Sequence, residues 1–595
     1  MRCFLFIILF LGTTCGLFAQ TEQLARNFFD QGEFEKALKV YERLYKENPS
    51  NPTYFNGVVA SYQQMEEFEK AHEMIVSRLN SSANNPSLLV ELGHNYELQD
   101  DDARATQLYD EALLSIEGRP NYAYIIARSF EEYNLLDYAV KAYERAMDLN
   151  ADRNYNLQLA RIYGEQGKIE EMFSNYLDLI EGDMKFYGLA NREFNRYISD
   201  DPQAEANIIF RKLLLKRLQE NPVLLYNEML SWLFVQQNEF DKAFAQERAI
   251  YKRSDSSSLQ GLLNLAVLAR EAEDYAAARE IMNYAIEESP SRTFNLQARH
   301  FLLNIKLETS TTADFPEIKN EFEALLTEFG YGAETLQLQI DYANFLAFKL
   351  GERNAAIEML KKASETTASK FELAKVKMAL ADVLVVEEKF NEALIYYSQI
   401  QNLVKNDEIA QDARFKVAKT SYYKGDFEWA STQLDILKKS TSQLIANDAL
   451  ELSLLISDNS LEDSAQTALK KYARADLLAF QKKNSEAINA LDSILVAHKG
   501  EKIEDEALLS QAKLYEEESD FKKAEGNYLE IINTFGDDIL ADNATYFLAE
   551  LYANQLQDPE KAKNYYEQII FNFADSIYFV EARKKYRMLR GDSIE

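Results

Sequence analysis

Two copies of one residue pattern lie 34 residues apart between Pro86 and Ala151, and much of the chain repeats that pattern with drift. Each copy has an apolar–small pair and an aromatic residue, followed by a second small–aromatic–small series. The first copy contains Leu92-Gly93, Tyr96, Ala105, Tyr109 and Ala112, and the second contains Ile126-Ala127, Phe130, Ala139, Tyr143 and Ala146. A fixed period of this length indicates a solenoid, in which one small unit is stacked many times.

The spacing inside one copy predicts a helical hairpin. Leu92 and Tyr96 lie four residues apart and share one face of a first helix. Ala105, Tyr109 and Ala112 follow at i, i+4 and i+7, which is one face of a second helix. The polar stretch 99–102 lies between them, where the turn is expected. A single hairpin leaves a face uncovered, so each unit needs a neighbour on both sides.

The pattern resembles the tetratricopeptide (TPR) repeat, which shares the 34-residue length and the small and aromatic positions. The resemblance implies an all-α fold, a TPR-type α-solenoid in which helical hairpins build a right-handed superhelix. It covers nearly all of the chain after the first 19 residues. An ordinary helical bundle is the alternative, but a bundle has no reason to keep a 34-residue period.

Composition narrows the class of protein and of ligand. The 595 residues are 47% hydrophobic, which is enough for a packed core, while only 19 glycines and 9 prolines argue against an all-β or loop-rich fold. The formal net charge of −32 argues against nucleic acid as the main ligand, because binding phosphate backbones needs clustered lysine and arginine. It also argues against broad adhesion to anionic membranes.

The first residues resemble a secretory signal peptide. A basic start, Met1-Arg2, precedes an apolar run from Cys3 to Leu11 that is too short for a permanent membrane span. Cleavage after Ala19 is favoured over the alternative of lipidation at Cys15. The protein is then expected to be exported and periplasmic, with outer-membrane association as a further option, and the ending of the segment resembles signal peptides of Bacteroidota. Since both cysteines precede residue 20, the mature chain would contain no thiol.

We expect five segments along the chain. They are a signal peptide (1–19), an N-terminal TPR array (20–182), divergent helical hairpins with TPR-like repeats (183–336), a C-terminal TPR array (337–577), and a capping helix and tail (578–595). No Gly/Ser-rich or Pro-rich linker interrupts residues 20–595. One continuous solenoid of about 14 hairpins is therefore expected, with an extra or degenerate helix at 442–459.

The C-terminal array has a longer period than the N-terminal array. Second-helix signatures recur after 37 residues (Ala393 to Ala430) and after 38 residues (Ala524 to Ala562). This half resembles the TPRs of outer-membrane assembly and cell-envelope coordinating proteins. The tail is predicted to be a capping helix with a polar, basic outer face, and a weak contact with lipid headgroups is the alternative; its cations are Arg583, Lys584, Lys585, Arg587 and Arg590.

Motifs that carry chemistry are missing from the sequence. The four histidines lie far apart, and no HExxH, GxSxG, P-loop or GxGxxG pattern occurs. We therefore predict no catalytic residues, no metal site and no cofactor. Asp-Ser-aliphatic triplets begin at Asp463, Asp492, Asp575 and Asp592 and resemble the O-glycosylation sequon of Bacteroidota, with helix capping as the alternative.

The sharpest site hypothesis follows from carrying the repeat along the first helices, which line the concave groove in TPR proteins. The register of His94 also contains Arg26, Ala60, Arg128 and Arg161, so three arginines and a histidine would form one column. Guanidinium groups in a groove could hold a carboxylate or an acidic peptide. The remaining groove candidates, expected near this column, are Asn56, Asn121, Tyr124 and Asn154. The alternative is that Arg128 pairs with Glu131 or Glu132, and Arg161 with Glu165, as ordinary surface charge.

The sequence therefore predicts a non-enzymatic scaffold of the cell envelope. Its partners would be proteins or peptides recognised in the groove, with a role in outer-membrane protein assembly or secretion. Two alternatives remain open. One is an envelope enzyme or carbohydrate-handling protein with a site in residues 183–222 or 293–336, and the other is a structural spacer that associates with itself through its end repeats.

Overall fold

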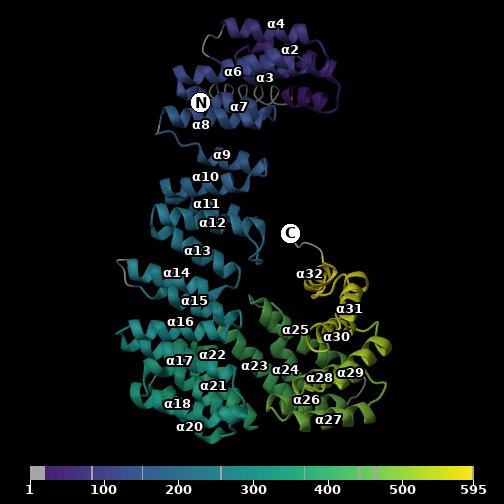
Figure 1. Cartoon of the computed structure of the whole chain (residues 1–595). Helices are drawn as coiled ribbons and strands as arrows, with labels where there is room; N and C mark the ends of the chain where they lie inside the picture. The colour runs from purple at the N-terminus through teal and green to yellow at the C-terminus, as the bar shows by residue number, and fades with distance from the viewer. Residues whose placement is uncertain are drawn as a thin grey trace, which may run out of the picture. The chain divides into compact units, whose positions relative to one another are not determined.

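The computed structural model describes residues 21–81, 85–150, 152–254, 258–366, 369–439, 442–460 and 466–591. Helices and short connections make up these residues, and no strand occurs among them (Figure 1). The predicted all-α fold of helical hairpins is confirmed. The chain divides into two compact units, Met1–Ile281 and Met282–Glu595. The predicted signal peptide, with Cys3 and Cys15, lies outside the described residues.

The first unit is a series of antiparallel helix pairs stacked in chain order (Figure 1). It begins with a helix over residues 21–30. The helices that follow are α2 (Phe34–Glu47), α3 (Pro52–Gln64), α4 (Phe68–Ser81), α5 (Ser87–Glu97), α6 (Asp102–Gly118), α7 (Ala123–Glu132), α8 (Leu136–Leu149), α9 (Asn156–Glu165), α10 (Ile169–Gly182), α11 (Tyr187–Phe194), α12 (Glu205–Glu220), α13 (Leu224–Gln236), α14 (Phe240–Arg253) and α15 (Gln260–Glu271).

The small and aromatic positions of the repeat pattern form the core of this unit. Ala105, Tyr109 and Ala112 are buried on α6, as the spacing predicts. Gly93 is small because the Tyr109 ring lies directly on its backbone: a Cβ at Gly93 would fall 2.4 Å from Tyr109 Cε1. Tyr109 in turn packs against Phe130 at 5.5 Å between ring centroids. The small residue at position 93 and the aromatic residue at position 109 are thus explained together, because the Tyr109 ring fills the space between the two helices.

A residue with left-handed backbone ends the first helix of each early repeat. These residues recur at the repeat period and are Gly32, Glu66, Asp100, Asn134 and Gly167, with φ between 58° and 75°. Glycine adopts this conformation freely, and Asn and Asp adopt it more readily than other residues. The turn therefore has the same geometry whether or not a glycine occupies it.

The second unit continues with helical pairs. The division between the units lies within α16 (Tyr275–Glu288). The helices that follow are α17 (Arg292–Glu308), α18 (Phe315–Phe329), α19 (Leu336–Asn344), α20 (Arg353–Thr366), α21 (Lys370–Val386), α22 (Phe390–Leu403), α23 (Glu408–Lys424), α24 (Phe427–Leu437), α25 (Gln443–Asp458), α26 (Thr467–Phe480), α27 (Asn484–Ala497), α28 (Ile503–Glu517), α29 (Phe521–Thr534), α30 (Ala541–Asn554), α31 (Pro559–Asn572) and α32 (Phe579–Arg590).

The predicted extra helix at 442–459 is present as α25, and it interrupts the simple stacking order. Helix α25 pairs with α24, whereas α26 packs back against α23. Lys419 on α23 forms an ion pair of 2.7 Å with Asp476 on α26. The α26–α27 turn reaches further back, since Gln481 Nε2 donates a hydrogen bond of 3.0 Å to the carbonyl of Val386. Helices α23 and α26 thus pack together across α24 and α25, while Ala449 and Leu452 of α25 are buried in the same hydrophobic core as α24 and α26.

The last helix, α32, has a mixed outer face. Ala582 is the only buried side chain of α32. Arg583 and Lys584 are exposed, as the sequence predicts. Large apolar side chains accompany them, with Val580 77% and Ile577 82% exposed. The terminal repeat therefore presents apolar residues together with cations, rather than a purely polar cap.

Candidate functional site

The predicted arginine column lies on first helices of the N-terminal unit. Arg26 lies on the helix over 21–30, Arg128 on α7 and Arg161 on α9, and all three are exposed. Arg128 forms an ion pair of 2.9 Å with Glu131 on its own helix. Tyr124, one turn before Arg128, is 48% exposed. The described residues give neither Arg26 nor Arg161 an ion pair.

His94, which belongs to the same register, packs against neighbouring side chains and does not stand free in a groove. Its ring stacks on Tyr133 with 3.9 Å between centroids, and its Nδ1 lies 3.2 Å from Glu97 Oε2. Tyr133 also donates a hydrogen bond of 2.5 Å to Glu91 Oε2. Burial raises the pKa of Glu91 to about 7, although the hydrogen bond from Tyr133 opposes that rise. His94 therefore belongs to a packed cluster between α5 and the end of α7.

The asparagine candidates serve local structure. Asn121 accepts a hydrogen bond from Arg153, and the Asn154 side chain accepts one of 3.0 Å from the backbone N–H of Asn156. Asn56 is half-buried on α3. Among the described residues, no hydrogen bond or ion pair joins two of the eight predicted site residues. Their role as a ligand groove stays a prediction.

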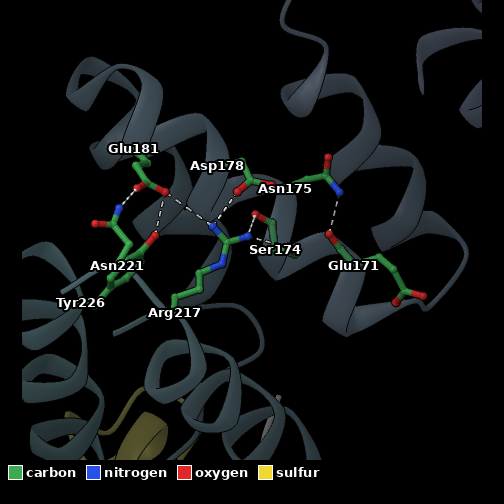
Figure 2. A network of polar contacts seen from close by, with 8 residues as sticks. All are labelled: Glu171, Ser174, Asn175, Asp178, Glu181, Arg217, Asn221 and Tyr226. Carbon is green, nitrogen blue, oxygen red and sulfur yellow. Dashed lines mark hydrogen bonds and ion pairs between the residues drawn. The ribbon is translucent and has the colours of Figure 1, made fainter. Parts of the chain in front are cut away.

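A polar network in the region predicted as divergent links three helices of the same unit (Figure 2). Arg217 on α12 forms an ion pair of 2.5 Å with Asp178 on α10, and donates hydrogen bonds to the Ser174 side chain and carbonyl at 2.6 and 3.0 Å. Tyr226 on α13 donates to Glu181 at 2.8 Å. The Arg217 side chain is only 14% exposed, and both terminal nitrogens of its guanidinium group have partners on α10. The network therefore holds α12 against α10.

Sequence reasoning missed a cavity of about 300 Å³ in the second unit, beside the extra helix α25. Its wall combines aliphatic side chains with ionisable ones from α25, α26, α28 and the connection between α29 and α30. The aliphatic residues are Leu454, Leu455, Leu509, Ile539 and Leu540, and the carboxyl groups are Glu451, Asp458, Asp505, Glu506 and Asp538.

The innermost polar groups of this cavity are two neighbouring carboxyls in the first turn of α28. Asp505 is only 7% exposed, and it accepts a hydrogen bond of 2.9 Å from the backbone N–H of Glu506. Asn459, the residue that ends α25, donates to Glu506 Oε1 at 3.1 Å. Glu506 Oε2 is buried and has no hydrogen-bond partner among the described residues. Burial, followed by the neighbouring Asp505, raises the pKa of Glu506 well above its usual range.

The described part of the chain holds no group of three or more His, Cys, Asp or Glu side chains placed to bind a metal ion. Within the same residues, no helix combines the length and apolar character needed to cross a membrane.

Comparison with known proteins identifies the type of repeat. The tetratricopeptide repeat model matches residues 23–58 and 228–293. The chain contains tetratricopeptide repeats. A curated relative, the TPR repeat-containing protein YpiA of Bacillus subtilis (strain 168), is 24% identical over 368 residues, which cover 61% of this chain and 83% of YpiA.

Two solved structures match the chain at low identity. The structure of Naa15/Naa10 bound to HypK-THB matches with a TM-score of 0.30 and 13% identity, over 97% of this chain and 94% of that chain. Yeast Tom70 matches with a TM-score of 0.27 and 17% identity, over 92% of this chain and 99% of Tom70. The tetratricopeptide repeats support a protein-interaction scaffold in general terms.

Proposed function

We propose that this chain is a non-enzymatic protein-binding scaffold of the cell envelope, which recognises peptide segments or partner helices through the first helices of its N-terminal repeats. One observation carries the proposal: Tyr124, Arg128 and Arg161 are all exposed on the first helices of consecutive repeats. The Arg128 side chain is 62% exposed, so its ion pair with Glu131 contributes little and can yield to a partner's carboxylate. A carboxylate-bearing peptide is the expected ligand, because guanidinium groups bind carboxylates in a bidentate manner.

The cellular part of the proposal is export, with a role in outer-membrane protein assembly or secretion. It rests on the leader-like segment 1–19 and on the resemblance of the C-terminal period to envelope TPR proteins. N-terminal analysis of the protein recovered from the envelope fraction tests export directly. A mature chain beginning at Gln20 supports it, and a chain that keeps residues 1–19 in the cytosol contradicts it.

The groove is tested by crosslinking in the cells that make the protein, followed by mass spectrometry of the captured proteins. The variant Arg128→Glu/Arg161→Glu reverses two charges on first helices. The matched control, Arg43→Glu/Arg104→Glu, reverses two exposed charges on the second helices α2 and α6. Loss of the captured proteins with the first variant and retention with the control support the groove. An identical captured set in all three proteins contradicts it.

The terminal helix α32 favours a second contact, with anionic lipid headgroups. Arg583 and Lys584 follow Ile577 and Val580 in the sequence, and all four side chains are exposed. Cations beside exposed apolar side chains are the combination that adsorbs to the surface of an anionic bilayer. The contact would hold one end of the scaffold close to a membrane without any span.

A further inference from the structure

The cavity beside α25 has a built floor and an open mouth. Asp505 and Leu509 are buried at its inner side. Glu451, Lys502 and Ile539 are exposed and line the mouth. Its volume of about 300 Å³ falls in the range of small-ligand sites, which are concave, mainly apolar and furnished with a few polar groups.

The origin of the cavity is the departure from regular stacking. Helix α26 packs against α23, while α25 pairs with α24 and contributes one wall of the hollow. The hydrogen bond from Asn459 to Glu506 holds the end of α25 against α28. The extra helix α25 therefore supplies one wall of the cavity, and α26, α28 and the connection between α29 and α30 supply the others.

The charges around the cavity select for a cation. Five carboxyl groups line it against two lysines, and one of these lysines, Lys513, lies 4.8 Å from the centre of the Phe547 ring. Asp505 is more than nine-tenths buried, and the described residues give it no ion pair. The orphan oxygen of Glu506 provides a second acceptor beside it. A buried carboxylate without a cationic partner is costly, so a ligand that brings a positive charge would be stabilised there.

The apolar wall selects for the rest of the ligand. Leu454 and Ile539 at the mouth are 38% and 66% exposed, and Leu455 and Leu540 continue the surface inward. An aliphatic stem of several methylene groups would cover these side chains while its charged end reached the carboxyl pair. Covering exposed aliphatic surface contributes about 25 cal/mol for each Å² removed from water.

We propose that the cavity beside α25 binds a primary alkylamine or alkylguanidine, with the cationic group at Asp505 and Glu506 and the aliphatic stem along Leu454 and Ile539. The ligand is either a free amine or the side chain of a lysine or arginine on a partner protein. This site lies in the second unit and does not depend on the arginine column of the first unit. A failure of the groove hypothesis would leave it untouched.

The test uses the full-length chain and three probes with five carbon atoms each and different head groups: n-pentylamine, 1-pentanol and pentanoate. Binding is followed by ligand-observed saturation-transfer NMR and titration. The expected order places pentylamine at least tenfold tighter than the other two. Equal binding of pentylamine and pentanol, tighter binding of pentanoate, or no binding of pentylamine would overturn the proposal.

Variants separate the two parts of the site. Asp505→Asn/Glu506→Gln keeps the shape and the acceptor for the Glu506 N–H, and is expected to weaken pentylamine at least tenfold while pentanol is unchanged. Leu454→Trp, at the mouth and away from the carboxyl pair, is expected to block all probes. Asp537→Asn, an exposed carboxylate outside the cavity lining, is the matched control. Retention of pentylamine affinity in the double variant also overturns the proposal.

A fourth probe distinguishes the source of the amine. Nα-acetyl-lysine N-methylamide carries the same ammonium on a peptide backbone. Binding comparable to that of pentylamine supports a lysine of a partner protein as the ligand. Binding of pentylamine alone supports a free amine, since the backbone then prevents entry.

Discussion

Tyr133 donates a hydrogen bond of 2.5 Å to Glu91, 42 residues earlier in the chain, and so links the end of α7 to α5. The same Tyr133 ring stacks on His94. The carboxyl group of Glu91 is almost fully buried by this arrangement, and the described residues give it no cationic partner. Burial therefore raises the pKa of Glu91 to about 7. A single carboxyl group then couples the stability of the N-terminal repeats to pH near neutrality.

The first prediction concerns Glu91→Gln. The unfolded chain ionises Glu91 near its ordinary pKa of 4.5, whereas the folded protein keeps the proton until about pH 7. The folded state thus binds more protons between these values, and the free energy of unfolding falls as pH rises from about 4.5 to about 7. The loss from this one group is on the order of 3 kcal/mol. Glu91→Gln is expected to remove that part of the slope in urea unfolding measured from pH 4.5 to 8.

Glu111→Gln is the matched control, because Glu111 is exposed on the neighbouring helix α6. It should leave the pH dependence of the parent protein unchanged. If Glu91→Gln and the parent lose stability in parallel as pH rises, the assignment of the effect to Glu91 is wrong.

The second prediction concerns the contact between Gly93 and Tyr109. The Tyr109 ring cannot move aside easily, because its hydroxyl donates to Glu97 at 2.9 Å and its ring packs against Phe130 and Tyr138. Gly93→Ala is therefore expected to destabilise the first unit by about 1–3 kcal/mol through overpacking. The higher helix propensity of alanine offsets only part of this, about 1 kcal/mol.

Gly188→Ala provides the comparison for that substitution, since nothing lies within 4 Å of a Cβ built at Gly188 on α11. Thermal unfolding followed by circular dichroism should show a lower midpoint for Gly93→Ala and an equal or higher midpoint for Gly188→Ala. If Gly93→Ala raised the unfolding midpoint instead, α5 and α6 would be able to move apart at this contact without loss of stability.

The repeat period makes much of the fold predictable from the sequence. Every stacked hairpin must bury the same positions, so Ala105, Tyr109 and Ala112 could be assigned to the core from spacing alone. The same logic identified α25 as an extra helix and the tail as a terminal one. The partner of Gly93 could not be read in this way, because spacing places residues on a face and does not say which ring lies on which backbone.

The site was much less predictable, again for physical reasons. The arginine column follows from the period, but the stacking of His94 on Tyr133 depends on rotamers that the sequence does not display. The cavity is lined by residues from Glu451 to Leu540, which the spacing within one repeat does not bring together. The adjacent carboxyls Asp505 and Glu506 at the start of a predicted helix were the only local signal. In a chain with 97 acidic residues, that signal does not stand out.

The third prediction concerns the network around Arg217. Arg217→Met keeps the aliphatic bulk and removes the cation, so Asp178 and the Ser174 carbonyl lose their donor and Glu181 loses its ion pair. Because the guanidinium is largely buried, a loss of about 2–4 kcal/mol is expected in the first unit. Hydrogen exchange should accelerate at α10, α12 and α13 in particular.

Arg196→Met tests whether any ion pair in this region would show the same effect. Arg196 pairs with Glu193 at 3.1 Å, but its side chain is 72% exposed, so its removal should change stability by less than about 1 kcal/mol. Equal effects of the two substitutions would mean that the buried network contributes no more than surface charge.

The fourth prediction concerns the membrane contact of α32. Arg583→Glu/Lys584→Glu reverses two exposed charges beside Val580 and Ile577. Each cation near an anionic bilayer contributes about 1 kcal/mol, so the double reversal should reduce co-sedimentation with vesicles containing 30% phosphatidylglycerol by at least tenfold.

The control variant Lys361→Glu/Lys362→Glu makes the same charge change at two exposed neighbouring lysines on α20, where no large apolar side chain is exposed. That control should sediment like the parent protein, and raising the salt concentration should weaken both alike, because surface attraction is screened. If the control loses binding equally, net charge governs the interaction; if neither variant changes it, α32 does not touch the bilayer.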